Sequence, residues 1–260
     1  MTDSPLLTAD DGAIRTITVN RPDKLNALDL PTLLALHAAF GAAADDDGVR
    51  VVVLTGSGPK AFVAGADIAG MATLPPTAAR DFSLAGQRMM RRIERMPKPV
   101  VAMVNGFALG GGLELAMCCH LRIAADSAKL GLPEVTLGLI PGFGGSQRLL
   151  RLAGRAAALE LCLLGAPVDA ARAQALGIVN RVVPAADLQQ ETMALAAKLA
   201  GQAPLAMRGI LDAVAVGAEC ALDDALEYES AQFGLVFSTE DAREGMAAFL
   251  ERRKPVFRNR

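Results

Sequence analysis

Two glycine-rich turns near the middle of the chain, each close to a single carboxylate, constrain the fold most strongly. The first lies in residues 105–114 (NGFALGGGLE), where a glycine run leads into an apolar segment whose only charged residue is Glu114. The second combines Glu134 with residues 140–145 (IPGFGG). A turn that leads into a helix presents free backbone N–H groups, which stabilise negative charge at the helix N-terminus. Such N–H groups beside a proton-transfer group suit chemistry on a carbonyl compound.

The first hundred residues alternate between strand and helix patterns. Unbroken β-branched runs are typical of strands that are covered on both faces, and apolar residues at helical spacing indicate helices that pack on a sheet. The predicted strands span residues 14–20, 50–55 and 100–104, and the predicted helices span residues 29–44 and 77–96. This order predicts an α/β body with crossover helices.

After the central turns the sequence becomes mostly helical. Helices are expected over residues 146–153, 156–164, 169–175, 187–201, 204–216, 221–236 and 238–252, with a short strand at 178–183. Glycine and proline separate these segments. We therefore expect a catalytic α/β domain over residues 1–185 and a helical C-terminal region over residues 186–260.

Composition excludes several classes of function. The chain of 260 residues has 26 Lys and Arg against 28 Asp and Glu, a net charge of −2, with no Trp and one Tyr. No general positive field favours nucleic acid or a membrane surface, and aromatic side chains for base stacking are scarce. The N-terminus lacks the apolar core of a signal peptide, and the four cysteines lack the spacing of a disulfide framework, so a cytoplasmic location is expected.

Residues 99–119 are the one stretch that imitates a membrane span. They include Asn105, Glu114 and several glycines, so we interpret them as a buried strand, a turn and a helix rather than a transmembrane segment. No membrane association is expected.

Common catalytic and binding motifs are absent from the sequence. Residues 142–147 (GFGGSQ) lack the third glycine of a dinucleotide-binding turn, and no phosphate-binding P-loop or G-x-S-x-G nucleophile motif occurs. His120 follows two cysteines, but adjacent helical positions point to different faces and cannot converge on one metal. No metal site is predicted.

Glu114 and Glu134 each allow two interpretations. An ionised carboxylate among apolar residues is costly to bury, so an ion pair with Arg122 or Arg148 would explain Glu114 structurally, and a salt bridge would explain Glu134. The glycine turns beside both acids favour a catalytic role instead, because they supply N–H donors next to a proton-transfer group.

Five ordered motifs resemble the enoyl-CoA hydratase/isomerase superfamily, also called the crotonase family. They lie at residues 64–68 (AGADI), 105–116, 133–135 (PEV), 139–149 (LIPGFGGSQRL) and 244–249 (EGMAAF). The resemblance implies a crotonase-like α/β spiral of ββα units. It also implies a helical C-terminal trimerisation region and a homotrimer or dimer of trimers.

The resemblance also assigns roles to residues of the two turns. It implies that the N–H groups of Ala66 and Gly111 form an oxyanion hole for a thioester oxygen. Glu114 would orient and deprotonate the water that attacks Cβ, and Glu134 would deliver a proton to Cα. Gly142 would help to orient the water or the acyl group.

The coenzyme A part of the substrate is expected to contact two other segments. The implied residues are Lys24, Leu25, Ala27, Ala64, Asp67 and Ile68, with Phe237 and Lys254 contributed by a neighbouring subunit. Plain core packing is the alternative for Phe237. No separate cofactor is implied, because coenzyme A is part of the substrate.

The implied activity is that of an enoyl-CoA hydratase, a lyase that adds water to a 2-enoyl-CoA. Alternatives are an isomerase or another reaction of the family on an acyl-CoA, and a non-catalytic protein that binds CoA thioesters. The presence of both Glu114 and Glu134 favours hydration. One departure from the family pattern is His120, which stands where many relatives have Asp.

Overall fold

The core of the protein is a six-stranded sheet with the strand order β1-β2-β3-β5-β7-β10. The computed structural model describes residues 4–260. β1 pairs antiparallel with β2, and all other neighbours in this sheet are parallel. The strands are β1 (Leu6–Asp11), β2 (Ile14–Val19), β3 (Val51–Gly56), β5 (Val100–Val104), β7 (Leu121–Ala125) and β10 (Arg181–Val183). β3 is buried throughout, as its β-branched sequence predicted.

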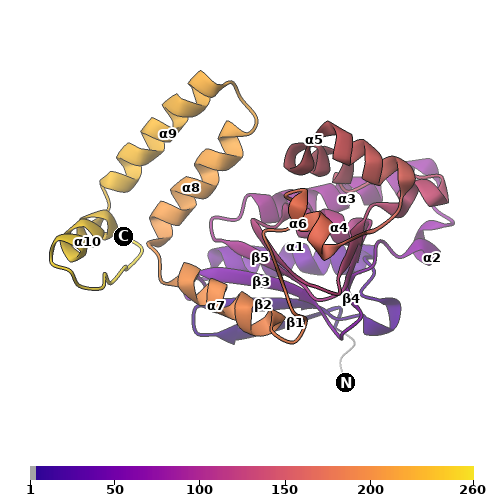
Figure 1. The fold of residues 1–260 in the computed structure, drawn as a ribbon, viewed down its shortest axis with the longest axis horizontal. Helices are drawn as coiled ribbons and strands as arrows, with labels where there is room; N and C mark the ends of the chain where they lie inside the picture. The colour runs from indigo at the N-terminus through magenta and orange to yellow at the C-terminus, as the bar shows by residue number, and fades with distance from the viewer. Residues whose placement is uncertain (1–3) are drawn as a thin grey trace.

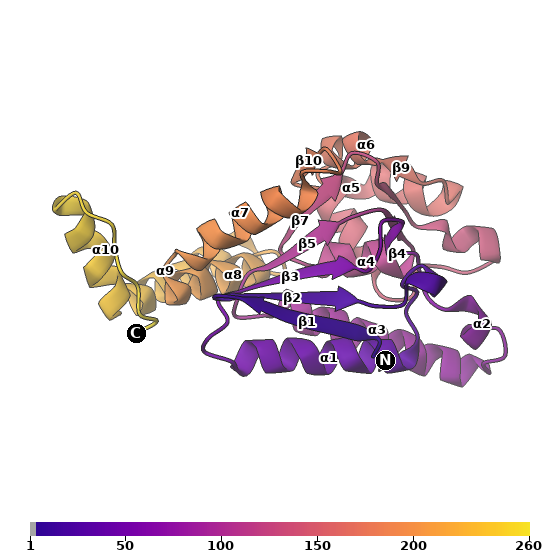
Figure 2. The same cartoon turned by 90° about the horizontal axis from the view of Figure 1, so that it is seen from below.

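Helices cover both faces of this sheet. Figure 2 shows α1 (Leu30–Asp45) and α3 (Pro76–Glu94) on one side and α7 (Leu188–Ala200) on the other. α1 starts where predicted, because the side chain of Asp29 accepts a hydrogen bond from the Thr32 N–H at 2.9 Å. The apolar residues of α7 pack on the face opposite to α1 and α3. The predicted boundary near residue 185 thus precedes a helix that packs on the body.

A second, smaller sheet lies at the end of the large sheet toward which β2 and β3 point (Figure 2). Its strand order is β4-β6-β8-β9, with β4 (Ala61–Val63), β6 (Phe107–Leu109), β8 (Lys129–Gly131) and β9 (Val168–Asp169). The chain passes from β3 to β4, from β5 to β6 and from β7 to β8, and each pair is followed by helical segments. This repetition is the series of ββα units that the family resemblance implied.

The helical segments after these strand pairs carry the two glycine turns. α4 (Gly111–Cys118) is buried along its whole length, which explains why its sequence is apolar on every side. The 3-10 helix η2 (Pro133–Leu137) and α5 (Gly145–Leu164) follow, and α5 is kinked at Gly154, where the sequence predicted a break. The shorter helices are η1 (Pro22–Lys24), α2 (Ile68–Met71) and α6 (Ala170–Ala175). No helix within residues 4–260 is long and apolar enough to cross a membrane.

The last three helices project away from the body (Figures 1 and 2). They are α8 (Pro204–Gly217), α9 (Leu222–Phe237) and α10 (Glu240–Leu250). Large apolar side chains on them are exposed, including Ile210, Val214, Leu222, Phe233, Leu235, Phe249 and Leu250. The Arg50 guanidinium donates to the carbonyl oxygens of Ala200 (3.1 Å) and Phe257 (3.0 Å), so the chain end is tied to the body.

Candidate active site

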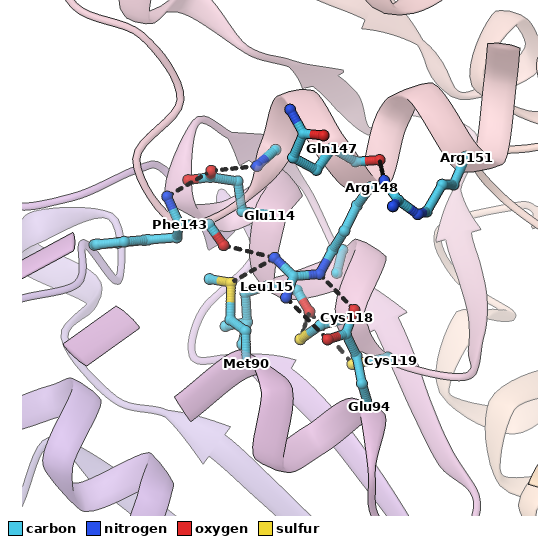
Figure 3. A network of polar contacts seen from close by, with 12 residues as sticks. Met90, Glu94, Glu114, Leu115, Cys118, Cys119, Phe143, Gln147, Arg148 and Arg151 are labelled. Carbon is cyan, nitrogen blue, oxygen red and sulfur yellow. Dashed lines mark hydrogen bonds and ion pairs between the residues drawn. The ribbon is translucent and has the colours of Figure 1, made fainter. Parts of the chain in front are cut away.

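Glu114 is the buried acid of the site. It lies in the first turn of α4, and 1% of its surface is exposed. The two hydrogen bonds that it accepts within residues 4–260 both reach Oε1, from the N–H of Phe143 at 2.8 Å and of Gly145 at 2.6 Å (Figure 3). These donors belong to the second glycine turn and the start of α5. The two glycine turns therefore meet at this one carboxylate.

Neither arginine suggested by the sequence forms an ion pair with Glu114. Arg148 binds Glu94 instead, with Nε 2.6 Å from Oε1. Arg122 donates to backbone carbonyl oxygens, among them that of Ile178 at 2.7 Å. The structural interpretation of Glu114 as half of an ion pair is thus wrong, and backbone N–H groups hold the carboxylate.

Glu134 contacts the turn from which α4 begins. A Cβ atom built on Gly110 would lie 2.8 Å from Oε1 of Glu134, so the carboxylate rests against the Gly110 backbone. Its Oε2 is buried and has no hydrogen-bond partner within residues 4–260. Gly110 also has a φ of +50°, which favours glycine. Glu134 therefore approaches the start of the Glu114 helix without a salt bridge. That one water molecule could join the two carboxylates stays a prediction.

The environment changes the proton affinity of both acids. Burial raises the pKa of Glu114 to about 7, against the hydrogen bond from Gly145, and the negative charge of Glu134 adds to the rise. Burial also raises the pKa of Glu134. A carboxyl group with a pKa near neutrality can both accept and release a proton under ordinary conditions.

The raised pKa of Glu114 predicts a pH-dependent stability difference for Glu114→Gln. Between the unfolded pKa near 4.5 and the folded pKa near 7, the folded protein binds more protons at this residue than the unfolded chain. The contribution of Glu114 to stability therefore falls as pH rises through this window, by at most about 3 kcal/mol. Chemical denaturation at pH 5 and pH 8 should show Glu114→Gln gaining stability relative to the wild type at the higher pH. The exposed control Glu160→Gln should show no such change, and an equal difference at both pH values for Glu114→Gln would contradict the prediction.

Ala66 and Gly111 lie side by side. A Cβ on Gly111 would be 3.5 Å from the backbone nitrogen of Ala66. Gly111 is the first residue of α4, so its N–H has no acceptor within the helix. The chain near Ala66 is bound through its neighbours, since the Leu28 N–H donates to the Gly65 oxygen and the Asp67 N–H donates to the Leu28 oxygen. Both hydrogen bonds of this parallel bridge between Leu28 and Ala66 therefore use the residues on either side of Ala66, and neither uses the Ala66 N–H.

The second glycine turn is fixed from behind by α3. The carbonyl oxygen of Gly142 accepts hydrogen bonds from Ser83 Oγ at 2.5 Å and Gln87 Nε2 at 3.0 Å. The Phe143 ring packs edge-on against Phe82 with a centroid distance of 5.2 Å. Sequence reasoning did not select these α3 residues. The only signal was their helical spacing, which is also typical of plain core packing.

The predicted coenzyme A contacts fall into two groups. Asp67 lies 3.0 Å from Lys24 Nζ, and the Ala64 N–H donates to the Leu25 oxygen at 3.0 Å, so two distant segments meet. Lys24 and then Arg21 hold the pKa of Asp67 below its usual value. The group brought together comprises Lys24, Leu25, Ala27, Ala64, Asp67 and Ile68. Phe237 instead ends α9 and Lys254 follows α10. Figure 1 shows these two helices on the opposite side of the molecule from α2.

His120 has a structural environment. Its Nδ1 accepts the Val100 N–H at 2.9 Å, and its Nε2 lies 3.3 Å from the Glu94 carbonyl oxygen. Burial lowers the pKa of His120, which favours the neutral ring that this pair of contacts requires. Within residues 4–260, no group of three or more His, Cys, Asp and Glu side chains is arranged to hold a metal ion.

Comparison with known proteins places the chain in a family. The family described as "Enoyl-CoA hydratase/isomerase" matches residues 9–260. A "Crotonyl-CoA hydratase" from Syntrophomonas wolfei is 48% identical over 94% of both chains, and a "Short-chain-enoyl-CoA hydratase" from Clostridium acetobutylicum is 44% identical over 96% of both. The crystal structure of an enoyl-CoA hydratase from Bacillus anthracis superposes with a TM-score of 0.96 at 37% identity, covering 98% of this chain and 100% of that one. The crotonase-like α/β fold is thereby confirmed, and the chain belongs to the enoyl-CoA hydratase/isomerase family.

Proposed function

We propose that this protein is an enoyl-CoA hydratase, which adds water across the 2,3 double bond of a 2-enoyl-CoA to give a 3-hydroxyacyl-CoA. One observation carries the proposal: two backbone N–H groups hold Oε1 of the buried Glu114, whose pKa is about 7, while Glu134 rests against the same helix start. The printed names of relatives that are 44–48% identical support this choice of substrate class.

The N–H groups of Ala66 and Gly111 would bind the thioester oxygen. As the nucleophile attacks Cβ, negative charge moves onto this oxygen and an enolate forms. Two N–H donors and the positive end of the α4 dipole stabilise that charge. In other enzymes one such donor has contributed about 3 to 4 kcal/mol to the stability of the transition state.

The two glutamates would exchange protons with the reacting atoms. Ionised Glu114 removes a proton from the water whose oxygen bonds to Cβ, and protonated Glu134 gives its proton to Cα. Glu114 ends protonated and Glu134 ionised, so the active site keeps its total charge and needs only proton exchange to reset. Burial raises the pKa of both carboxyl groups, but two N–H donors stabilise the ionised form of Glu114, whereas Oε2 of Glu134 has no hydrogen-bond partner within residues 4–260. This contrast supports Glu134 as the acid that is protonated beforehand.

Other residues of the protein would bind the remaining parts of the substrate. The cluster around Lys24, Leu25 and Asp67 is the proposed binding surface for the coenzyme A portion, together with Ala27, Ala64 and Ile68. Gly142 would orient the water or the acyl group. Phe237 and Lys254 would be contributed by a neighbouring subunit. Their position on the projecting C-terminal part, away from this cluster, supports that arrangement. No separate cofactor takes part in this scheme.

A homotrimer, alone or as a dimer of trimers, is the proposed assembly. Apolar side chains such as Phe249, which is 82% exposed, and Leu250, which is 80% exposed, would be covered by neighbouring subunits. Sedimentation equilibrium is expected to give three or six times the 27.0 kDa chain mass. Phe249→Asp should shift the equilibrium toward smaller species, whereas Arg208→Ala, which removes an exposed ion pair on α8, should not. A wild-type protein that sediments as a monomer would contradict the proposal.

The test of the proposed activity is the loss of the conjugated enoyl-thioester absorbance when the purified protein meets crotonyl-CoA. A hydratase is expected to consume the absorbance until the hydration equilibrium is reached, with 3-hydroxybutyryl-CoA as the product. Binding of the thioester with unchanged absorbance would contradict hydration of this substrate. A panel of 3-enoyl, longer and aryl thioesters would then distinguish an isomerase or another reaction from a protein that only binds CoA thioesters.

A further inference from the structure

The N–H groups that hold Glu114 belong to a turn that is itself hydrogen-bonded to a half-buried arginine. Arg148 lies one turn into α5, and its Nη1 donates to the carbonyl oxygen of Phe143 at 2.5 Å. Phe143 is the residue whose N–H donates to Oε1 of Glu114. Figure 3 shows the chain of contacts that runs from Arg148 through Phe143 to Glu114. One peptide segment therefore connects the guanidinium to the carboxylate.

Glu94 fixes the guanidinium. Arg148 Nε and Nη2 lie 2.6 Å and 3.0 Å from the two carboxylate oxygens of Glu94, near the end of α3. Paired N–H donors on one carboxylate set the plane and the position of an arginine. The Arg148 side chain is 14% exposed, and Nη1 also lies 3.8 Å from the sulfur of Met90. With Nε and Nη2 bound to Glu94, Nη1 is directed at the Phe143 oxygen.

We propose that Arg148, oriented by Glu94, is a positioning residue for Glu114: it holds the Phe143 carbonyl so that the N–H groups of Phe143 and Gly145 converge on Oε1. The inference rests on the proposed function for its effect on hydration. Its effect on Glu114 itself is measurable without turnover.

Charge adds to this geometric effect. The groups that face Glu114 are Glu134 from η2 and Arg148 and Cys162 from α5. Burial raises the pKa of the Cys162 thiol, so this residue stays neutral, and Glu134 raises the pKa of Glu114. Arg148 is the positive member of the group and lowers the pKa of Glu114. Removing the guanidinium weakens the two N–H bonds and deletes this charge, and both changes favour the protonated form of Glu114.

The experiment compares Arg148→Met, Arg148→Lys and the matched control Arg151→Met. Arg151 lies one turn further along α5 in an exposed ion pair with Glu219 at 3.1 Å. The pKa of Glu114 is measured by infrared titration. The carboxyl band of Glu114 is identified in each protein as the one that disappears when the substitution Glu114→Gln is introduced as well. Hydration of crotonyl-CoA gives kcat, and binding of saturated butyryl-CoA gives affinity without chemistry.

In Arg148→Met the Glu114 titration is expected to move upward by about one pH unit, since a lost opposite charge and lost hydrogen bonds act in the same direction. Its kcat should fall about 10- to 100-fold, because a small misplacement of a catalytic group costs this much. Affinity for butyryl-CoA should change by less than about threefold, which separates positioning from unfolding. Arg148→Lys keeps the positive charge, so the pKa of Glu114 should lie close to the wild-type value, but kcat should be only partly restored. Arg151→Met should match the wild type in every measurement.

A Glu114 titration in Arg148→Met that equals that of the wild type would overturn the inference, and so would a kcat per folded molecule that is unchanged. If Arg148→Met does not fold, Arg148→Lys decides, because wild-type kcat with a single-point lysine charge would show that the fixed guanidinium geometry is not needed. A wild-type protein without hydratase activity would refute the proposed function alone, since the infrared titration still tests the link between Arg148 and Glu114.

Discussion

Replacing Glu114 with Gln is expected to lower kcat for the hydration of crotonyl-CoA by about 10²- to 10⁴-fold, the usual contribution of a general acid or base. The amide oxygen of Gln can still accept the N–H groups of Phe143 and Gly145, so the turn keeps its position. An amide cannot take a proton from water near neutral pH. The loss therefore falls on the chemical step, and affinity for butyryl-CoA should stay close to that of the wild type.

Glu134→Gln should lower kcat over the same range for a different reason. The proposed donor of the Cα proton is then missing, while the water is still activated by Glu114. Solvent deuterium incorporation at Cα of the product distinguishes the two steps, because it reports delivery of this proton. The kcat of the double variant is expected to lie no more than about tenfold below that of the less active single variant, since the effects of residues that act as a unit are not additive.

The exposed control Glu160→Gln should keep the wild-type kcat. If Glu114→Gln retained more than about a tenth of the wild-type activity, Glu114 would not be the general base. The same variant is expected to be more stable than the wild type at pH 8, because the cost of burying an ionised carboxylate disappears. A simultaneous loss of activity and gain of stability would identify Glu114 as a residue kept for chemistry rather than for folding.

The long elements were predictable because they repeat their pattern over several turns or pleats. α1, α3 and β3 agree with the predicted ranges within a few residues, and the turn glycines lie at the starts of α4 and α5. β4, β6 and β8 each have three residues, which is too few to show a period of two. Their strand geometry comes from parallel pairing between segments that are far apart in the sequence.

The hydrogen-bond partners of Glu114 and Glu134 were less predictable than the two residues themselves. Side-chain identity suggested an arginine for Glu114, but its donors are backbone N–H groups, which every residue except proline carries. Arg148 does lie nearby, and its ion pair is with Glu94, 54 positions earlier in the chain. Sequence reasoning thus identified Arg148 as a neighbour of Glu114 but did not identify its ion pair with Glu94, because helix packing rather than local spacing brings α3 beside α5.

Gly112→Ala is expected to have the largest effect on stability. A Cβ on Gly112 would lie 1.8 Å from the carbonyl oxygen of Val63 and 2.7 Å from its carbon. Both are backbone atoms at the end of β4, so no side-chain rotation can make room. β4 and α4 would have to move apart, which should lower the free energy of unfolding by about 3 kcal/mol or more. Chemical denaturation of the variant beside the wild type measures this loss.

The same displacement should impair catalysis, because β4 leads to Ala66 and α4 carries Gly111 and Glu114. Separation of the two elements widens the space between the paired N–H groups, and we expect the kcat/KM of the folded variant to fall by about 10²-fold. Gly70→Ala is the matched control for stability, because a Cβ there meets no atom within 4 Å. Its free energy of unfolding should stay at the wild-type value or rise by up to about 1 kcal/mol, because Ala is favoured over Gly inside a helix. If Gly112→Ala were as stable as this control, close contact between β4 and α4 would not be needed to build the site, and the proposed oxyanion hole would lose its structural basis.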